Sequence, residues 1–415
     1  MPSVKSKPKK VGEMKRGEPR PKKADICLYK NIDLPAETAL YYGFSITDTP
    51  VITKEDVKRA RAITEPELRG RESLDTLKKF SVEEKTALMR MYEERKLEAT
   101  PQPVMCYFDK PIIHEGSEQK ITGKDRLVSL EIMGDHSSIS EAILIKTTLE
   151  ILKEEGFQNL SVNLNSVGDR ETVVRFTKEL TAYYRKNVAE LPAHCRQLMK
   201  KDIFSLLSCK NEKCRIIKDS APKSMNFLSE ASRAHFKEVL EYMEMLEIPY
   251  EIDHFLVGNR AFSCQTVFEI HDNDSKDKCE ALASGVRYSN IAKRLGYKKD
   301  LPGIGVHLSF KEINSIKNIK FLKPKIYFIQ LGFEAKLHSL KIIEILRKEK
   351  IPMYQAISRD KLSSQLGMAE TMKIPYTIIM GQKEAIENTV IVRDMGNRSQ
   401  ETIKIGDLPR YLKRL

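Results

Sequence analysis

The stretch that decides the fold of the C-terminal quarter reads IYFIQLGFEAKLHSLKIIEILRKEKIPMYQAI, residues 326–357. A short apolar run is followed by a stretch with helical periodicity and then by a second strand-like run, which predicts strand, helix and strand. A helix at 361–372 and a strand at 376–380 continue the series. Because strands joined through helices pair in parallel, we predict a small α/β domain. Strands at 389–393 and 402–405 and a basic helix ending at Leu415 complete it.

The residues before this domain predict a different architecture. Helical stretches end at glycine or turn residues and do not alternate one for one with strands, which favours an antiparallel sheet flanked by helices over a doubly wound parallel sheet. We therefore predict an α+β protein with a basic tail at 1–23, a core domain at 24–322 and the α/β domain at 323–415. Within the core, helices are expected at 141–155 and 229–246, and strands at 160–164, 250–252 and 265–270.

The charge balance indicates a polyanionic partner. The 415 residues include 71 Lys and Arg against 58 Asp and Glu, a formal net charge of +13. Such an excess is typical of proteins that bind nucleic acid. Residues 1–23 hold nine basic and two acidic side chains. We expect a mobile tail that either holds phosphates or only aids solubility.

Composition and cysteine spacing also indicate where the protein acts and whether it binds a metal ion. Apolar runs such as 326–333 are far shorter than the roughly 20 residues of a membrane-spanning helix, and nothing near Met1 resembles a secretory signal. The 7 cysteines form no CxxC pair, which is typical of free thiols in the cytoplasm. Cys209 and Cys214 have a spacing found in some metal sites, but no second pair accompanies them, and the histidines never fall at i and i+4. No metal site is predicted.

Six segments in chain order carry a family resemblance. They resemble signatures of histidyl-tRNA synthetases, and the resemblance extends from about residue 36 to 415. It implies a class II synthetase fold, a homodimer and a C-terminal domain that contacts tRNA. The segments are NLNSVGDR at 163–170, DSAPK at 219–223, IPYEID at 248–253, TVFE at 266–269, IMGQKE at 379–384 and VIVRD at 390–394.

The same resemblance implies that three catalytic positive charges are missing. Class II synthetases hold ATP phosphates with arginines, whose guanidinium is permanently charged and bidentate. Where the family has an arginine in a Phe-Arg-x-Glu context, this chain has His114. The arginine of Gly-x-Glu-Arg is replaced by Glu312, and that of Arg-Gly-Leu-Asp-Tyr-Tyr by Gly258. One lost charge-stabilising donor costs roughly 2.7 to 4 kcal/mol in the transition state, so little adenylation is expected.

Some substrate-pocket residues persist. Glu84, Thr86 and Glu131 are similar to family residues that hold the histidine substrate, and Arg287 with Tyr288 matches part of Gly-Gly-Gly-Arg-Tyr-Asp. We therefore expect these five residues at a substrate site.

Three of these residues have a second interpretation, and neighbouring substitutions alter the pattern. Glu84 has the spacing of a capping box with Ser81, Glu131 also suits an outward-facing strand position, and Arg287 also suits an anchor for the turn at Gly285. Lys85 replaces a family glycine and adds bulk, and Leu127 replaces a glutamine. Arg260 would face the same side as Gly258 on a strand and could replace the missing arginine.

The sequence thus favours a histidyl-tRNA synthetase-like protein that has lost adenylation and serves as a tRNA-binding or regulatory paralogue. The basic residues Arg410, Lys413 and Arg414 are the predicted tRNA-facing patch. One alternative is a diverged but active histidine-tRNA ligase, which would use ATP and magnesium; no cofactor is otherwise predicted. The other is a histidine-sensing subunit like that of ATP phosphoribosyltransferase, although such subunits usually lack an anticodon-binding domain.

Overall fold

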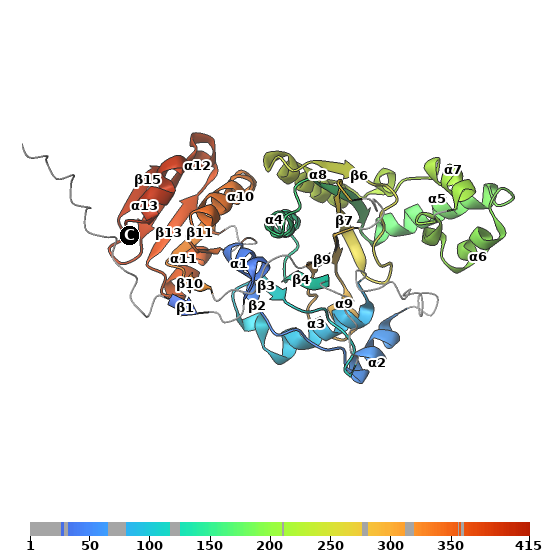
Figure 1. Cartoon of the computed structure of the whole chain (residues 1–415), viewed down its shortest axis with the longest axis horizontal. Coiled ribbons are helices and arrows are strands. Elements are labelled where there is room, and N and C mark those ends of the chain that lie inside the picture. Colours follow the sequence, from blue (N-terminus) through green and yellow to red (C-terminus); the bar gives the residue numbers. More distant parts are fainter. Residues whose placement is uncertain are drawn as a thin grey trace, which may run out of the picture.

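The computed structural model describes most of the chain (Figure 1). The basic tail at 1–23 and Glu312 lie outside the described residues. Within the described part, no helix combines the length and the apolar character that crossing a membrane requires. The described residues are 26–28, 32–64, 80–116, 125–209, 211–275, 281–311, 319–355, 357 and 361–415.

An eight-stranded sheet forms the centre of the core. Its neighbouring strands pair antiparallel except at the two edges, where β2 with β3 and β5 with β6 are parallel. The predicted antiparallel sheet is therefore confirmed. In spatial order its strands are β2 (Ser45–Ile46), β3 (Val104–Phe108), β4 (Asp125–Met133), β9 (Gly303–Lys311), β8 (Ala283–Tyr288), β7 (Ser263–Asp272), β5 (Leu160–Gly168) and β6 (Tyr250–Ile252).

Helices cover both faces of this sheet (Figure 1). Side chains alternate along a strand. Leu130 and Ile132 of β4 therefore pack on one face of the sheet, in the main apolar core, while Met133 packs on the other face, against the helix Val82–Glu94 (α3). The predicted helices 141–155 and 229–246 are α4 and α8. The first group is α1 (Leu34–Tyr41), α4 (Ile139–Glu154) and α8 (Glu230–Met245), and the second is α2 (Lys54–Ile63), α3 (Val82–Glu94) and α9 (Ile291–Arg294).

A helical insertion follows β5 and projects from one end of the molecule (Figure 1). It consists of α5 (Arg170–Lys186), α6 (Ala193–Lys201), a 3-10 turn (Ile203–Leu206) and α7 (Glu212–Asp219). Its apolar side chains form a cluster of their own, which includes Phe176, Leu180 and Tyr184.

The C-terminal α/β part forms a five-stranded sheet. Strands β11, β12 and β13 pair in parallel, as predicted, and β14 and β15 add antiparallel. The predicted strand at 353–357 is shorter than expected. The strands, in spatial order, are β12 (Tyr354–Gln355), β11 (Ile326–Gln330), β13 (Tyr376–Met380), β14 (Thr389–Asp394) and β15 (Gln400–Lys404); the helices are α10 (Phe333–Lys348), α11 (Leu362–Thr371), α12 (Gln382–Glu387) and α13 (Leu408–Leu412).

A two-stranded sheet ends the core, and helix α10 fastens the C-terminal part to it. The strand β1 (Ile26–Leu28) pairs antiparallel with β10 (Lys320–Leu322), just before the C-terminal sheet begins. Helix α10 packs on α4 and α8. Its Arg347 lies 3.0 Å from the Glu150 carboxylate of α4 and also pairs with Glu154. The two parts are therefore joined by an ion-pair network as well as by apolar packing.

Candidate functional site

A group of charged side chains is buried between α3 and the central sheet. The ammonium of Lys85 lies 2.6 Å from Oε1 of Glu131 and 3.2 Å from Oε1 of Glu84. It also lies over the rings of Phe80 and Tyr288, at 4.3 and 4.6 Å from their centroids. All five side chains are buried. Two carboxylates and two aromatic faces therefore hold one cation away from water.

A histidine completes the group. Nε2 of His307 lies 3.1 Å from Oε1 of Glu84, and its ring centroid is 4.0 Å from that of Phe80. The Tyr288 hydroxyl donates to Oε2 of Glu131 at 2.9 Å. We name this group the Lys85 cluster: Phe80, Glu84, Lys85, Glu131, Tyr288 and His307.

Two glycines on β9 make room for the cluster. Glu131 of β4 lies opposite Gly305, and Tyr288 of β8 lies opposite Gly303. A Cβ at Gly305 would come within 2.2 Å of the Glu131 carboxylate, and one at Gly303 within 2.5 Å of the Tyr288 hydroxyl. His307 follows Gly305 by two residues and therefore faces the same side. The register of three strands thus assembles the cluster.

The start of α3 supplies the other charges. The side chain of Ser81 accepts a hydrogen bond from the backbone N–H of Glu84 at 3.0 Å, so the Ser81 half of the predicted capping box is present. The Glu84 carboxylate, however, binds Lys85 and His307. The outward-facing alternative for Glu131 is wrong, because this side chain is fully buried in the cluster.

The two carboxylates of the cluster differ in their proton affinity. Burial alone would raise the pKa of Glu84, but His307 and Lys85 outweigh it and hold this pKa at about 2. Burial raises the pKa of Glu131 above its usual value, and the charge of Glu84 adds to this effect despite the attraction of Lys85. Because the Glu84 carboxylate is ionised, Nε2 of His307 is the donor toward it. The Tyr288 hydroxyl keeps its proton, since burial and then Glu131 raise its pKa strongly.

Arg287 lies on the other face of the sheet. It is opposite Ile304 in the β8–β9 register, and its Nε donates to Glu141 of α4 at 2.5 Å. Its terminal nitrogen donates to the backbone oxygen of Asp135 at 2.8 Å, and His235 lies 2.7 Å from Glu141. The arginine therefore anchors the first turn of α4, and it joins neither the cluster nor the turn at Gly285.

Thr86 and Arg260 also lie apart from the cluster contacts. The Thr86 hydroxyl donates to the carbonyl of Val82 one turn earlier in α3, at 2.8 Å. Arg260 lies in a turn before β7, so the expected strand alternation with Gly258 is wrong. Its guanidinium pairs with Asp202 at 2.5 Å, beside the helical insertion. As placed, it is bound to the insertion and does not replace an arginine at Gly258.

Two of the three positions where the resemblance predicts a missing catalytic arginine can be located. His114 forms a parallel bridge with Ile52 just after β3. Gly258 lies in the connection from β6 to β7, where an added Cβ would meet the Ser263 hydroxyl at 2.3 Å. A larger side chain therefore does not fit at Gly258 unless this connection moves. The third position, Glu312, lies outside the described residues.

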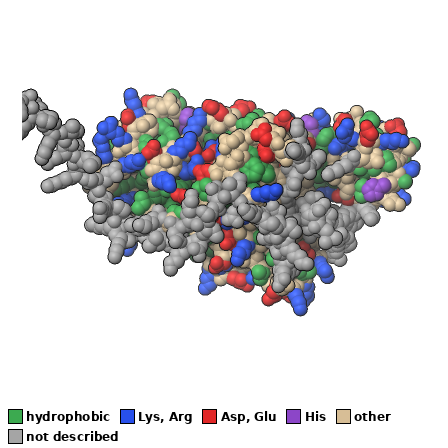
Figure 2. All heavy atoms as spheres, in the orientation of Figure 1, with side chains coloured by type: hydrophobic (Ala, Val, Ile, Leu, Met, Phe, Trp, Pro, Cys, Tyr) green, Lys and Arg blue, Asp and Glu red, His purple; other side chains and the backbone are tan. Residues whose placement is uncertain are grey.

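The predicted tRNA-facing residues lie at the end of the C-terminal part. Arg410, Lys413 and Arg414 are exposed on and just after α13. Lys413 pairs with Glu349 at the end of α10, with a distance of 2.7 Å. Figure 2 shows Lys and Arg side chains over this part of the molecule, mixed with acidic ones. Their role in RNA binding stays a prediction.

Sequence reasoning missed the contributions of Phe80 and His307. Both contact the cluster through their rings. Strand alternation offered a signal for His307, since it stands two residues after Gly305 on a strand paired with that of Glu131. Lys85 was noted as bulk, but its charge pairing depends on a strand 46 residues further along the chain.

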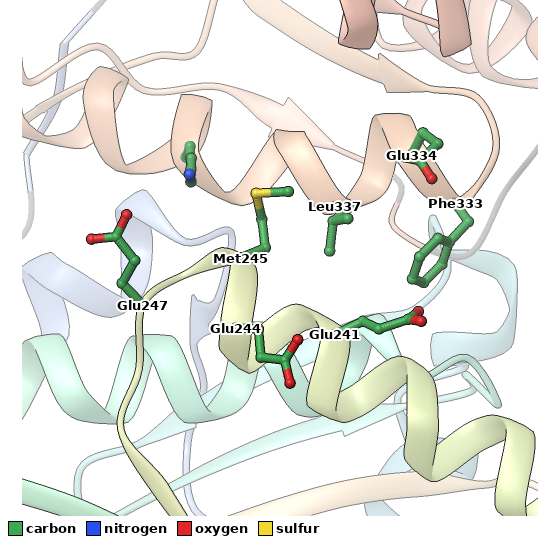
Figure 3. A pocket seen from close by; sticks show the side chains of 8 residues that line it. Glu241, Glu244, Met245, Glu247, Phe333, Glu334 and Leu337 are labelled. Atoms are coloured by element: carbon green, nitrogen blue, oxygen red, sulfur yellow. The ribbon is translucent and has the colours of Figure 1, made fainter.

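A surface hollow of about 490 Å³ lies elsewhere, between α8 and α10. Figure 3 shows Glu241 and Glu244 on α8 beneath Phe333 and Leu337 on α10. The four glutamates in its lining oppose a single lysine, Lys341. An acidic surface repels phosphates, so the hollow is a poor site for a nucleotide or RNA.

Comparisons with known proteins give one family match and several similar proteins. The family described as "Anticodon binding domain" matches residues 325–415. The histidine–tRNA ligase of Desulforamulus reducens is 27% identical over 334 residues, 78% of this chain and 79% of that protein. That of Dehalococcoides mccartyi is 26% identical over 396 residues, 91% of this chain and 93% of that protein. The crystal structure of apo S. aureus histidyl-tRNA synthetase aligns with 22% identity and a TM-score of 0.48, over 91% and 93% of the two chains.

An antiparallel sheet between helices, joined to an anticodon-binding α/β part, defines an aminoacyl-tRNA synthetase-like protein. The chain is thus similar to histidine–tRNA ligases over most of its length, and its C-terminal part matches the anticodon-binding family.

Proposed function

We propose that this protein is a tRNA-binding or regulatory member of its family that no longer activates histidine. The observation that carries the proposal is the buried ammonium of Lys85 between Glu84 and Glu131. By family resemblance these two carboxylates hold the histidine substrate. In this chain their charge is taken by a lysine of the protein itself.

A free histidine would have to displace this lysine. The ammonium is 2.6 Å from Glu131 and fully buried, and two aromatic rings cover it. A group held on the same chain competes at a high effective concentration, because it has already lost its translational freedom. Weak or absent histidine binding is the expected consequence.

The positions at which family members hold the ATP phosphates support the same proposal. Arginine is absent at Gly258 and His114, and Arg260 is bound to Asp202. Because a Cβ at Gly258 would meet Ser263, the missing guanidinium cannot be restored by one substitution without a change in the backbone. Developing negative charge on a phosphate would therefore lack preorganised partners.

The C-terminal part supports the binding half of the proposal. Its sequence matches the anticodon-binding family over residues 325–415, and the chain carries a net charge of +13. The homodimer and the cytoplasmic location expected from the sequence belong to this proposal too. Sedimentation velocity tests the homodimer.

The first experiment measures histidine-dependent ATP–pyrophosphate exchange together with tRNA binding. We expect no exchange above the background without histidine, and tRNA binding that weakens with salt. Replacement of Arg410, Lys413 and Arg414 by Ala should reduce the slope of log affinity against log salt by about 0.9 for each phosphate that the variant no longer neutralises. Lys237→Ala on the exposed face of α8 is the matched control and should leave the slope unchanged.

The alternatives have distinct outcomes. The relatives are named histidine–tRNA ligases, and exchange at an ordinary turnover would establish that activity here and refute the proposal. Absent tRNA binding combined with binding to a phosphoribosyltransferase would instead establish the histidine-sensing subunit.

A further inference from the structure

Three cysteines from separate segments converge in the helical insertion. Cys195 lies in α6, Cys209 follows the 3-10 turn, and Cys214 lies in α7. The sulfur atoms of Cys195 and Cys209 are 3.5 Å apart, and all three sulfur atoms lie within 4.8 Å of one another. Cys195 and Cys214 are buried, and Cys209 is half-buried. The spacing of Cys209 and Cys214 alone did not indicate this third thiol.

We propose that these three cysteines bind a zinc ion as thiolates. With Zn–S bonds of about 2.3 Å and tetrahedral angles, neighbouring sulfur atoms lie about 3.8 Å apart. The Cys195–Cys209 separation of 3.5 Å is close to this value, and the third sulfur atom lies within 4.8 Å of both. A disulfide requires about 2.05 Å, which is much shorter than the Cys195–Cys209 separation. The thiols are therefore arranged around a common point and are not bonded in a pair.

Two of the cysteines stand at helix starts, where the helix dipole partly offsets the effect of burial on a thiolate. Cys195 and Cys214 are each the third residue of a helix, α6 and α7. The positive end of the helix dipole favours a thiolate at such positions. The Asn211 side chain caps α7 and accepts from the backbone N–H of Lys213 at 3.1 Å, which fixes the start of this helix.

Tyr184 of α5 is an independent indication. Its hydroxyl is buried and has no hydrogen-bond partner among the described residues. Burial raises its pKa, and charge on Cys214, Cys209 and Cys195 raises it further, so the phenol keeps its proton. A buried donor beside a cluster of thiols is satisfied when those thiols become thiolates. Hydrogen bonds of this kind tune the metal affinity of a ligand set.

Metal binding must release protons here. Burial, followed by the neighbouring cysteines, raises the pKa of Cys214 to about 12, and burial also raises that of Cys195. A zinc ion displaces the thiol protons when it binds cysteine, so zinc affinity should fall as pH falls. Among the described side chains only these three donors converge, so a water molecule or a small anion at the half-buried Cys209 side takes the fourth position. The ion would tie α6, the following loop and α7 together.

The test measures metal in the full-length protein, purified with a reductant and without a chelator. We expect about one zinc per chain by elemental analysis. Replacement of zinc by cobalt(II) should give a thiolate-to-metal charge-transfer absorption. Cys214→Ser should lose both signals, whereas Cys264→Ser, a half-buried free thiol on β7, should keep them.

The variant Tyr184→Phe distinguishes zinc-bound thiolates from neutral cysteines that only pack together. It removes only a hydroxyl, and we expect zinc affinity to weaken about tenfold. If wild-type protein contains no stoichiometric zinc and gives no cobalt absorption, the cysteines are packed neutral thiols and the proposal fails. It fails equally if the unreduced protein lacks two titratable thiols and contains no metal, since that indicates a disulfide. The wild-type cobalt spectrum decides the question even if Cys214→Ser does not fold.

Discussion

Replacement of Lys85 by Met removes the buried charge while keeping most of the side-chain volume. With an effective dielectric constant of about 20, the ammonium attracts the Glu131 carboxylate by roughly 6 kcal/mol and that of Glu84 by roughly 5 kcal/mol, at distances of 2.6 and 3.2 Å. Desolvation of the ions offsets most of this gain, at several kcal/mol per ion. The variant, however, leaves two carboxylates buried without their cation. We therefore expect the free energy of unfolding to fall by about 3 to 5 kcal/mol.

Urea unfolding followed by far-UV circular dichroism measures this change, since the chain has no tryptophan. Glu131→Gln in the same protein removes one orphaned charge and keeps an acceptor for Tyr288, so the double variant should recover more than half of the loss. Lys237→Met on the surface is the control and should change stability by less than about 0.5 kcal/mol. A Lys85→Met protein as stable as wild type would refute this electrostatic reasoning. It would also refute the proposal that Lys85 blocks the predicted histidine site.

Three further predictions concern the surroundings of the site. Burial alone would raise the pKa of Glu141, but its partners Arg287 and His235 hold this pKa at about 2. Because the pKa is lower in the folded protein than the value of about 4.5 in the unfolded chain, the ionised carboxylate stabilises the fold above pH 4.5. This contribution, at most about 3 kcal/mol, is lost as the pH falls toward 2. Urea midpoints between pH 7 and pH 3 should show this loss, and Glu141→Gln should flatten it; equal slopes would exclude this carboxylate. Gly305→Ala should destabilise the protein by about 1 to 3 kcal/mol, because the new Cβ would meet the Glu131 carboxylate. Gly367→Ala in α11 is the control, since open space surrounds this glycine, and it should not destabilise the protein. Equal melting temperatures of the two variants would contradict the steric argument. Arg347→Ala should cost about 2 kcal/mol and increase proteolysis between core and C-terminal part, and unchanged cleavage would show that the network does not hold the two parts together.

Local pattern was sufficient for the C-terminal part and for most core elements. The strand–helix series from Ile326 onward has clear periodicity, and short connections leave few possible topologies. The strand expected at 353–357 came out as the two residues Tyr354–Gln355. Strand ends depend on hydrogen bonding to neighbours, which a single segment does not encode.

Local sequence predicted only some features of the site. Ser81 as a helix cap is a local property, and the structure confirms it. We expected Arg260 to share a strand face with Gly258, two residues earlier, yet the segment before β7 forms a turn and places the arginine beside Asp202. Tertiary contacts outweighed a weak local preference for extended backbone.

The amino-acid sequence by itself indicated the resemblance to histidyl-tRNA synthetases and the antiparallel core with its α/β C-terminal part, because each depends on residue types in order along the chain. The absence of arginine at Gly258 and His114 stays a prediction from that resemblance. Only the tertiary structure decided that Lys85 neutralises Glu84 and Glu131. That pairing depends on the register of β4 against β9 and on the docking of α3. Charges far apart in sequence interact strongly only after folding has removed the water between them.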